Sequence, residues 1–231
     1  MTREKIIVND ARPSVLDLYC CQGGAARGYE RAGLCVAGGV DKDPQPKFPY
    51  PFIQSDAIAF VMEHAGWIRQ NVTLVHASPP CQLDSDCQRI MDREHPDLIG
   101  PTREALDWLG LPYVMENVRG AVHKLRNPVM LCGSMFGLTR TYRHRYFETG
   151  GWTLEQPEHL EHPVAQVKLG RSAQEGQPIQ AIGNFSGVGI IRDEWQVPWM
   201  NRDGIREAIP PAYAEFIGRR FLAMISERSS V

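Results

Sequence analysis

Short apolar runs recur along the chain, and between them apolar side chains repeat every three or four residues. Each run is short and bounded by turn-forming residues, which favours strands. The runs lie at 15–18, 34–40, 73–77, 113–115 and 129–131. The helical spacing occurs at 25–32, 58–68 and 98–109. This alternation predicts an α/β fold, a Rossmann-like doubly wound and mainly parallel sheet with helices on both faces.

The pattern changes after residue 149, where Gly and Pro interrupt a stretch with little apolar periodicity. We expect one domain at 1–149, a small insertion of loops and short strands at 150–190, and a C-terminal segment at 191–231 that returns to the first domain. Within that last segment, Pro210-Pro211 is a helix start signal, and apolar residues follow at helical spacing as far as Met224.

Composition narrows the class of protein. No apolar stretch approaches the roughly 18 residues of a membrane span, and the polar N-terminus lacks the apolar core of a signal peptide. We therefore expect a cytoplasmic protein without a membrane partner, and a monomer. The net charge of −2 argues against binding nucleic acid through bulk electrostatics, so any such contact needs a local basic face.

One stretch rich in basic residues could supply that face. It has almost no acidic residues, although an ordinary solvated surface explains it equally well. Its members are Arg119, His123, Lys124, Arg126, Arg140, Arg143 and Arg145.

The six cysteines show neither a C-x-x-C spacing nor an accompanying His pattern. Zinc sites and disulfide frameworks usually carry such spacings. We therefore expect reduced thiols and no metal.

One cysteine is nevertheless placed for chemistry. Pro79-Pro80-Cys81-Gln82 follows the predicted strand at 73–77, so Cys81 should lie just past the carboxyl end of a strand, where open α/β sheets bind ligands. The two prolines restrict φ and keep this segment out of a helix. A cysteine held there is suited to nucleophilic attack, and the alternative is a buried structural thiol.

Further blocks accompany Cys81 in a fixed order. They are Asp17-Leu18-Tyr19-Cys20-Cys21-Gln22-Gly23-Gly24, Val114-Met115-Glu116-Asn117-Val118, Arg143-His144-Arg145 and Ala208-Ile209-Pro210-Pro211-Ala212-Tyr213. With these blocks the chain resembles the cytosine carbon-5 methyltransferases, particularly the compact bacteriophage forms. The resemblance implies an S-adenosylmethionine-dependent methyltransferase fold. It also implies methyl transfer to cytosine in a short target of double-stranded DNA, with 1–149 catalytic and 150–190 recognising the target.

The resemblance also assigns a cofactor site for S-adenosylmethionine. Asp41 would bind the ribose, Asp56 would lie near the adenine amino group, and the 19–24 backbone would surround the methionine part. Helix capping is the alternative for both acids, and a tight turn is the alternative for Gly23-Gly24. The full set is Asp17, Tyr19, Cys20, Cys21, Gln22, Gly23, Gly24, Asp41, Lys42, Asp56, Ala57 and Pro79.

The reaction of this family assigns the remaining residues. The Cys81 thiolate adds to carbon 6, carbon 5 accepts the methyl group, a base removes the carbon-5 proton and the thiol leaves. Glu116 would hold ring nitrogen 3 and the exocyclic amine, which requires a raised pKa; a salt bridge to an arginine is its alternative. Arg145 would contact oxygen 2 and Arg143 the base or a phosphate, unless both are solubilising edge charges. The other substrate-binding residues would be Gln82, Ser85 and Asn117.

The chain departs from the family pattern at five positions, which are Cys21, Lys42, Asp84, Thr141 and Glu207. The short insertion predicts a target of about two to four base pairs, because few side chains can reach base edges. Two alternatives remain open, methylation of a structured RNA such as tRNA and a weakly active binding module of the same fold. A dinucleotide oxidoreductase is disfavoured because G-x-G-x-x-G is missing.

Overall fold

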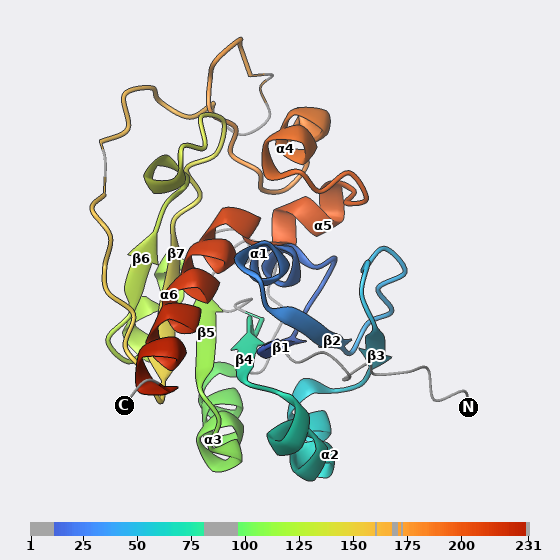
Figure 1. Cartoon of the computed structure of the whole chain (residues 1–231). Coiled ribbons are helices and arrows are strands. Elements are labelled where there is room, and N and C mark those ends of the chain that lie inside the picture. Colours follow the sequence, from blue (N-terminus) through green and yellow to red (C-terminus); the bar gives the residue numbers. More distant parts are fainter. Residues whose placement is uncertain (1–11, 81–96, 160, 168–170, 172, 230–231) are drawn as a thin grey trace.

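A seven-stranded sheet forms the centre of the chain (Figure 1). The computed structural model describes residues 12–80, 97–159, 161–167, 171 and 173–229. The strands are β1 (Ser14–Leu18), β2 (Cys35–Asp41), β3 (Phe52–Gln54), β4 (Leu74–Ala77), β5 (Tyr113–Asn117), β6 (Val129–Leu131) and β7 (Arg145–Gly150). Their order is β3-β2-β1-β4-β5-β7-β6, and β7 runs antiparallel to both of its neighbours while the rest are parallel.

All five strands predicted from apolar runs are confirmed, whereas β3 and β7 lack such a run. β3 is only three residues long and follows a proline-rich segment. β7 has the sequence Arg-Tyr-Phe-Glu-Thr-Gly, in which Phe147 and Glu148 are the buried residues. Because the buried Glu148 interrupts the apolar residues, β7 does not appear as an apolar run in the sequence.

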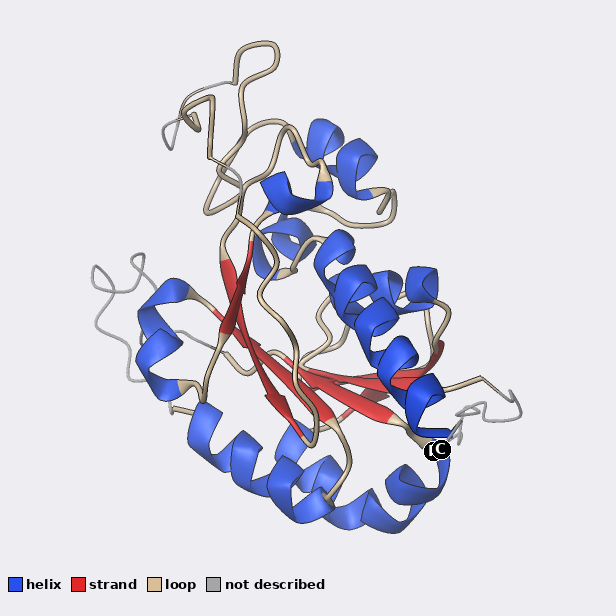
Figure 2. Cartoon of the chain, turned by 60° about the vertical axis from the view of Figure 1, so that its left-hand side comes forward, coloured by secondary structure: helices blue, strands red, loops and turns tan. Residues whose placement is uncertain are grey.

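Two layers of helices cover the sheet, as the alternation predicts (Figure 2). On one face lie α1 (Gly24–Ala32) and α6 (Pro211–Ser229); on the other lie α2 (Ala57–Asn71) and α3 (Ile99–Leu109). Each layer buries its own apolar cluster against the strands. None of the helices in the described ranges combines the length and apolarity needed to cross a bilayer.

The α1–α6 contact depends on glycines in α1. A Cβ atom on Gly24 would lie 2.5 Å from the carbonyl oxygen of Ile209. One on Gly28 would overlap the carbonyl oxygen of Pro211 and lie 2.8 Å from the backbone nitrogen of Glu215. The start of α6 therefore packs directly on the α1 backbone, which returns the end of the chain to the first domain.

The stretch after β7 forms a small third core. Its described part, between 151 and 187, contains no helix or strand, so the expected short strands are not found there. Two short helices that the sequence analysis does not predict follow, α4 (Val188–Trp195) and α5 (Arg202–Glu207). Their apolar residues pack with Ile179 and Phe185 of the preceding loop. The remaining elements are the 3-10 helices η3 (Arg119–Lys124) and η4 (Gly133–Phe136).

A buried carboxylate ties β7 to the rest of the sheet. The side chain of Glu148 is fully buried and accepts hydrogen bonds from Arg103 Nε at 2.8 Å, Arg103 Nη2 at 2.7 Å, Tyr113 Oη at 3.1 Å and the Arg126 backbone N at 2.8 Å. Four donors satisfy both oxygens, so the charge is compensated where water cannot reach it.

The packing of α1 on α6 yields a stability prediction. Gly28→Ala should lower the free energy of unfolding by about 1–3 kcal/mol, because the added methyl group meets backbone atoms that cannot rotate away. Urea unfolding followed by circular dichroism measures the change.

Gly66→Ala in α2 is the matched control, since a Cβ there meets nothing within 4 Å. In a helix interior it should raise stability by roughly 0.4–1 kcal/mol. Equal effects of the two substitutions would contradict the close α1–α6 contact.

Candidate active site

Most of the predicted site residues that the structure describes lie at one edge of the sheet, because parallel strands end together there. The register pairs Leu18 of β1 with Val40 of β2 and with Ala77 of β4, and it pairs Ala77 with Met115 of β5. The loop at 19–24, Asp41, Pro79 and the end of β5 therefore follow one another along this edge.

The loop at 19–24 has an unusual backbone. Tyr19 and Cys21 adopt φ values of 58° and 47°, and Gly23 adopts 85°. Positive φ is unfavourable for residues with a side chain, so the surrounding contacts must hold the loop. Asp41 provides one of them, because its Oδ2 accepts a hydrogen bond from the Cys21 backbone N at 3.0 Å.

Gly23 and Gly24 have structural reasons to be glycine. A Cβ on Gly23 would lie 3.1 Å from the ring of Phe48, and Gly24 is the close contact with Ile209 described above. The tight turn that the sequence left open as an alternative is therefore present. The approach of a ligand to this backbone stays a prediction.

Two of the predicted cofactor residues, Asp17 before the loop and Cys20 within it, are buried. Asp17 Oδ2 accepts a hydrogen bond from the Ala26 backbone N at 3.2 Å, and burial raises the pKa of Asp17 to about 8. Cys20 packs with Ala26 and Phe48, and burial also raises its pKa. A thiol with a raised pKa stays protonated, so Cys20 contributes apolar surface instead of a nucleophile.

Side chains of the same loop connect it to α5. The Sγ of Cys21 donates a hydrogen bond to Glu207 Oε2 at 3.2 Å, so two of the five departures from the family pattern are partners. Burial, followed by the charge of Glu207, raises the pKa of Cys21. Gln22 Nε2 donates to Asn201 Oδ1 at 2.9 Å, and the Asn201 backbone N donates back to Gln22 Oε1 at 3.1 Å.

Asp56 is the N-cap of α2, where its Oδ1 accepts a hydrogen bond from the Ala59 backbone N at 2.9 Å. The capping alternative is therefore realised, and a role near adenine stays a prediction. Lys42 is exposed. Tyr19 and Ala57 border an apolar depression between β1, α2 and α3. It is too small to enclose even a water molecule, so it is not a preformed cofactor pocket.

The segment before Cys81 is held by Asn117. Its Nδ2 donates a hydrogen bond to the Pro79 carbonyl oxygen at 3.1 Å, and its Oδ1 accepts one from the Val118 backbone N at 2.9 Å. Asn117 therefore connects the end of β5 to the residues that lead into Cys81. Cys81 itself, Gln82 and Ser85 lie outside the described residues.

Glu116 forms a buried ion pair with Arg145. The antiparallel register places Asn117 opposite Tyr146, so the first residue of β7 lies beside the carboxyl end of β5. Arg145 Nε is 2.9 Å from Glu116 Oε1, and both side chains are largely buried. Burial raises the pKa of Glu116. The charges of Arg145 and Arg143 and the hydroxyl of Ser78 lower it by a smaller amount, so the pKa is raised overall. The direction agrees with the raised pKa expected, and the ion pair left open as an alternative is also present.

Arg143 forms its hydrogen bonds with other parts of the chain. Its φ of 35° is a left-handed backbone conformation, so Arg143 and Arg145 do not lie on one extended segment. Arg143 Nη1 donates to the Ala181 carbonyl oxygen at 2.9 Å, and its Nη2 donates to that of Arg206. The buried hydroxyl of Tyr213 lies 2.8 Å from the carbonyl oxygens of Tyr142 and Arg143 and holds this turn. Arg143 thus connects β7 to the insertion and α5, and its role toward a base or phosphate stays a prediction.

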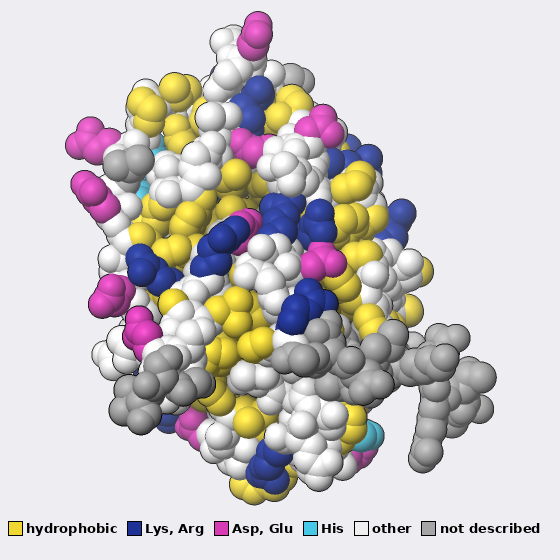
Figure 3. All heavy atoms as spheres, in the orientation of Figure 1, with side chains coloured by type: hydrophobic (Ala, Val, Ile, Leu, Met, Phe, Trp, Pro, Cys, Tyr) yellow, Lys and Arg dark blue, Asp and Glu magenta, His cyan; other side chains and the backbone are white. Residues whose placement is uncertain are grey.

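The predicted basic face is partly neutralised in the folded chain. Lys124 lies 3.3 Å from Asp97 and Arg126 lies 3.0 Å from Asp107, acids that are distant in the sequence. On the face with α1 and α6, the Lys and Arg side chains lie in small groups between apolar and uncharged ones (Figure 3). Arg119 and His123, exposed members of the predicted face outside these two ion pairs, remain candidates for nucleic-acid contact.

A buried histidine joins α1 to the residue that follows β4, and it is not among the predicted site residues. His76 Nδ1 is 3.0 Å from the Tyr29 hydroxyl, and His76 Nε2 is 3.0 Å from Ser78 Oγ. Ser78 is also one of the groups that lower the pKa of Glu116. The feature of the sequence that could have identified His76 is its position within the otherwise apolar run at 73–77. Burial lowers the pKa of His76 to about 3, so it is a neutral member of this chain of hydrogen bonds.

A second group of reactive side chains lies outside the predicted site. Cys132, His144, His159 and His162 place their potential metal-ligating atoms within 4.8 Å of one another. The expectation of no metal therefore has no support from the structure. In the sequence, the H-x-x-H spacing of His159 and His162 could have indicated this group. The other two members, His144 and Cys132, lie 15 and 27 residues before His159, so the spacing alone does not connect them.

Solved structures share this architecture, whereas neither a protein-family model nor a curated protein sequence matches the chain. A prophage-encoded E. coli protein described as a DNA modification methyltransferase matches with a TM-score of 0.59 at 14% identity, over 93% of this chain and 99% of that chain. The S. pombe Dnmt2 methyltransferase matches with a TM-score of 0.57 at 13% identity and the same coverage. The chain therefore has the fold of these methyltransferases, as its sequence blocks predict.

The buried histidine yields a pH prediction. The pKa of His76 is lower in the folded chain than in the unfolded chain, so the unfolded chain binds more protons and stability falls as the pH drops from 6.5 toward 3. This group alone should cost about 2 kcal/mol of unfolding free energy between pH 8 and pH 5.

His76→Gln should lose less stability over that interval, because glutamine does not titrate. Urea unfolding of both chains at each pH measures the difference, and the buried Asp17 is common to both. Parallel pH profiles would show that His76 is accessible to protons in the folded state.

Proposed function

We propose that the chain is a cytosine carbon-5 methyltransferase that uses S-adenosylmethionine and acts on a short target in double-stranded DNA. One observation carries the proposal. The buried Glu116–Arg145 pair lies at the end of β5, and the neighbouring Asn117 holds the backbone of the Pro79-Pro80 segment that leads into Cys81. Attack on a cytosine ring requires a carboxyl group with a raised pKa, a guanidinium and a cysteine thiolate. Glu116 and Arg145 supply the first two, and the sequence predicts Cys81 as the third.

The residues at the neighbouring strand ends fit S-adenosylmethionine. Asp41 ends β2, where a carboxylate binds ribose hydroxyls in Rossmann-like folds, and the positive-φ loop at 19–24 ends β1. When bound, S-adenosylmethionine supplies an electrophilic methyl group on its sulfonium sulfur.

Each predicted catalytic residue then has a defined task. The Cys81 thiolate forms a bond to carbon 6 of cytosine and breaks the C5–C6 double bond, which makes carbon 5 nucleophilic. Glu116 in its protonated form donates to ring nitrogen 3 and so neutralises the charge that develops on the ring. Arg145 leaves part of its pairing with Glu116 to contact oxygen 2. After carbon 5 accepts the methyl group, a base removes the carbon-5 proton, which restores the double bond as the Cys81 sulfur leaves.

Access to the base requires that cytosine leave the helical stack, so we propose base flipping. The loop after β7 and the small core of α4 and α5 lie beside the predicted site, and Arg143 joins them to β7. Their small size supports recognition of only two to four base pairs. By analogy with compact phage enzymes, the biological role would be the masking of viral DNA from host nucleases.

Methyl incorporation and covalent trapping test the function together. The full chain with methyl-labelled S-adenosylmethionine should label duplex DNA, and a duplex with 5-fluorocytosine should form a stable adduct with Cys81, because fluorine cannot leave as a proton does. Glu116→Gln should lower the methylation rate by roughly 10²–10⁴-fold, the contribution of a positioned acid. Cys81→Ala should abolish both signals.

Two results would redirect the proposal. Label only in tRNA would assign the same chemistry to RNA, and no label or adduct on any nucleic acid would leave a binding module of this fold. Arg219→Ala removes an exposed arginine that is paired with Glu215 on α6, and this matched control should methylate as the wild-type chain does.

Binding of the methyl donor gives an independent test. Asp41→Asn keeps an acceptor for the Cys21 backbone N but loses the charge proposed to bind the ribose, so the Kd for S-adenosylmethionine should rise about tenfold or more. Asp43→Ala, two residues away and exposed, should leave the Kd unchanged. Isothermal titration calorimetry measures both; equal affinities in all three chains would exclude Asp41 from the donor site.

A further inference from the structure

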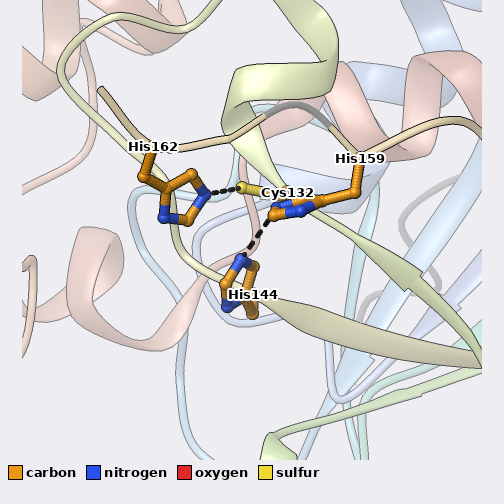
Figure 4. A group of neighbouring side chains, drawn as sticks. All are labelled: Cys132, His144, His159 and His162. Atoms are coloured by element: carbon orange, nitrogen blue, oxygen red, sulfur yellow. Dashed lines mark hydrogen bonds between the residues drawn. The ribbon is translucent and has the colours of Figure 1, made fainter. Parts of the chain in front are cut away.

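Four potential metal ligands meet at one end of the β6–β7 hairpin (Figure 4). Cys132 directly follows β6, His144 directly precedes β7, and His159 and His162 lie in the loop after β7. The strand pairing brings the first two together, and the loop folds back so that the other two reach them. The side chains in Figure 4 point toward a common centre.

The spacing of these atoms suits a tetrahedral ion. Cys132 Sγ lies 3.1 Å from His162 Nε2, and His144 Nε2 lies 3.3 Å from His159 Nε2. Zinc bonds of 2.0–2.3 Å with tetrahedral angles place ligand atoms about 3.3–3.6 Å apart. All separations are at most 4.8 Å, so the side chains need only contract slightly around an ion.

Neighbouring side chains orient these groups. Ser134 Oγ donates a hydrogen bond to Cys132 Sγ at 3.2 Å. The Tyr142 ring stacks on His162 with centroids 3.8 Å apart and an interplanar angle of 12°. Such supporting contacts are typical of built metal sites.

We propose that Cys132, His144, His159 and His162 bind one Zn²⁺ ion in a closed structural site. One thiolate and three imidazoles are the donors that zinc prefers, whereas calcium and magnesium require oxygen ligands. Four protein ligands leave no position for water or substrate, which distinguishes a structural from a catalytic zinc site. Binding forms the Zn–S bond and releases the Cys132 thiol proton to solvent.

The site would fasten the loop after β7 to the hairpin beside the predicted active site. Arg145 adjoins His144, and its Nη1 donates to the His144 carbonyl oxygen at 2.9 Å. An ion held by His144 would therefore fix the backbone that presents Arg145 to Glu116. Among the residues described at 155–159 and 161–166, no apolar side chain is buried, so a metal cross-link would supply order that apolar packing does not.

Metal content tests the proposal without any need for activity. The untagged full chain, expressed with zinc in the medium and passed through a weak chelator, should retain one Zn²⁺ per chain by mass spectrometry of the metal. Cobalt(II) in its place should show a thiolate-to-cobalt charge-transfer band and the intense d–d bands of a tetrahedral ion. Stripping the metal with a strong chelator should lower the Tm by several degrees, and zinc should restore it.

Two variants and a control make the result specific. His159→Ala changes an exposed side chain and should fold, yet it should lose most of the retained zinc; Cys132→Ser should also lose the thiolate band. His123→Ala removes an exposed histidine outside the group and should keep the full zinc content. A wild-type chain that retains no zinc, or a folded His159→Ala that retains all of it, would overturn the site. Neither result bears on methylation of DNA, so the two proposals fail separately.

Discussion

The antiparallel pairing of β5 with β7 fixes the arrangement on which the candidate site depends. It places Tyr146 opposite Asn117 and so brings Arg145 beside Glu116. At the other end, Gly150 lies opposite Tyr113, where any Cβ would overlap the tyrosine ring, and Trp152 Nε1 donates to the Tyr113 carbonyl oxygen at 3.2 Å. A slip of one residue would turn every β7 side chain to the opposite face and separate these groups.

Two buried carboxylates on this strand pair have different environments. Glu148 accepts hydrogen bonds from four donors and anchors β7 to α3. Glu116 is paired with one arginine, Arg145, and burial raises its pKa. A fully paired charge serves structure, whereas an incompletely compensated one can change protonation during a reaction. The contrast assigns the first to the fold and the second to the proposed chemistry.

The proposed active site and the proposed metal site share the start of β7. Arg145 contacts Glu116 with its side chain, and its neighbour His144 belongs to the metal group. Arg143, one residue further back, reaches the insertion and α5. Three consecutive residues thus contact three different parts of the chain. The positive φ of Arg143, held by the Tyr213 hydroxyl, is the turn that allows them to diverge.

Apolar periodicity is enough to predict five of the seven strands and the four main helices, because it reports directly which face of an element is buried. The ordered blocks around Cys81 and Glu116 indicate the methyltransferase fold. Neither β3 nor β7 could be predicted in this way, nor could the separate partners of Arg143 and Arg145 or the bond of Cys21 to Glu207. Only the tertiary structure placed Cys132 and His144 beside His159 and His162. Those features depend on contacts between residues distant in the chain, and such contacts leave no periodic signal in the segments that make them.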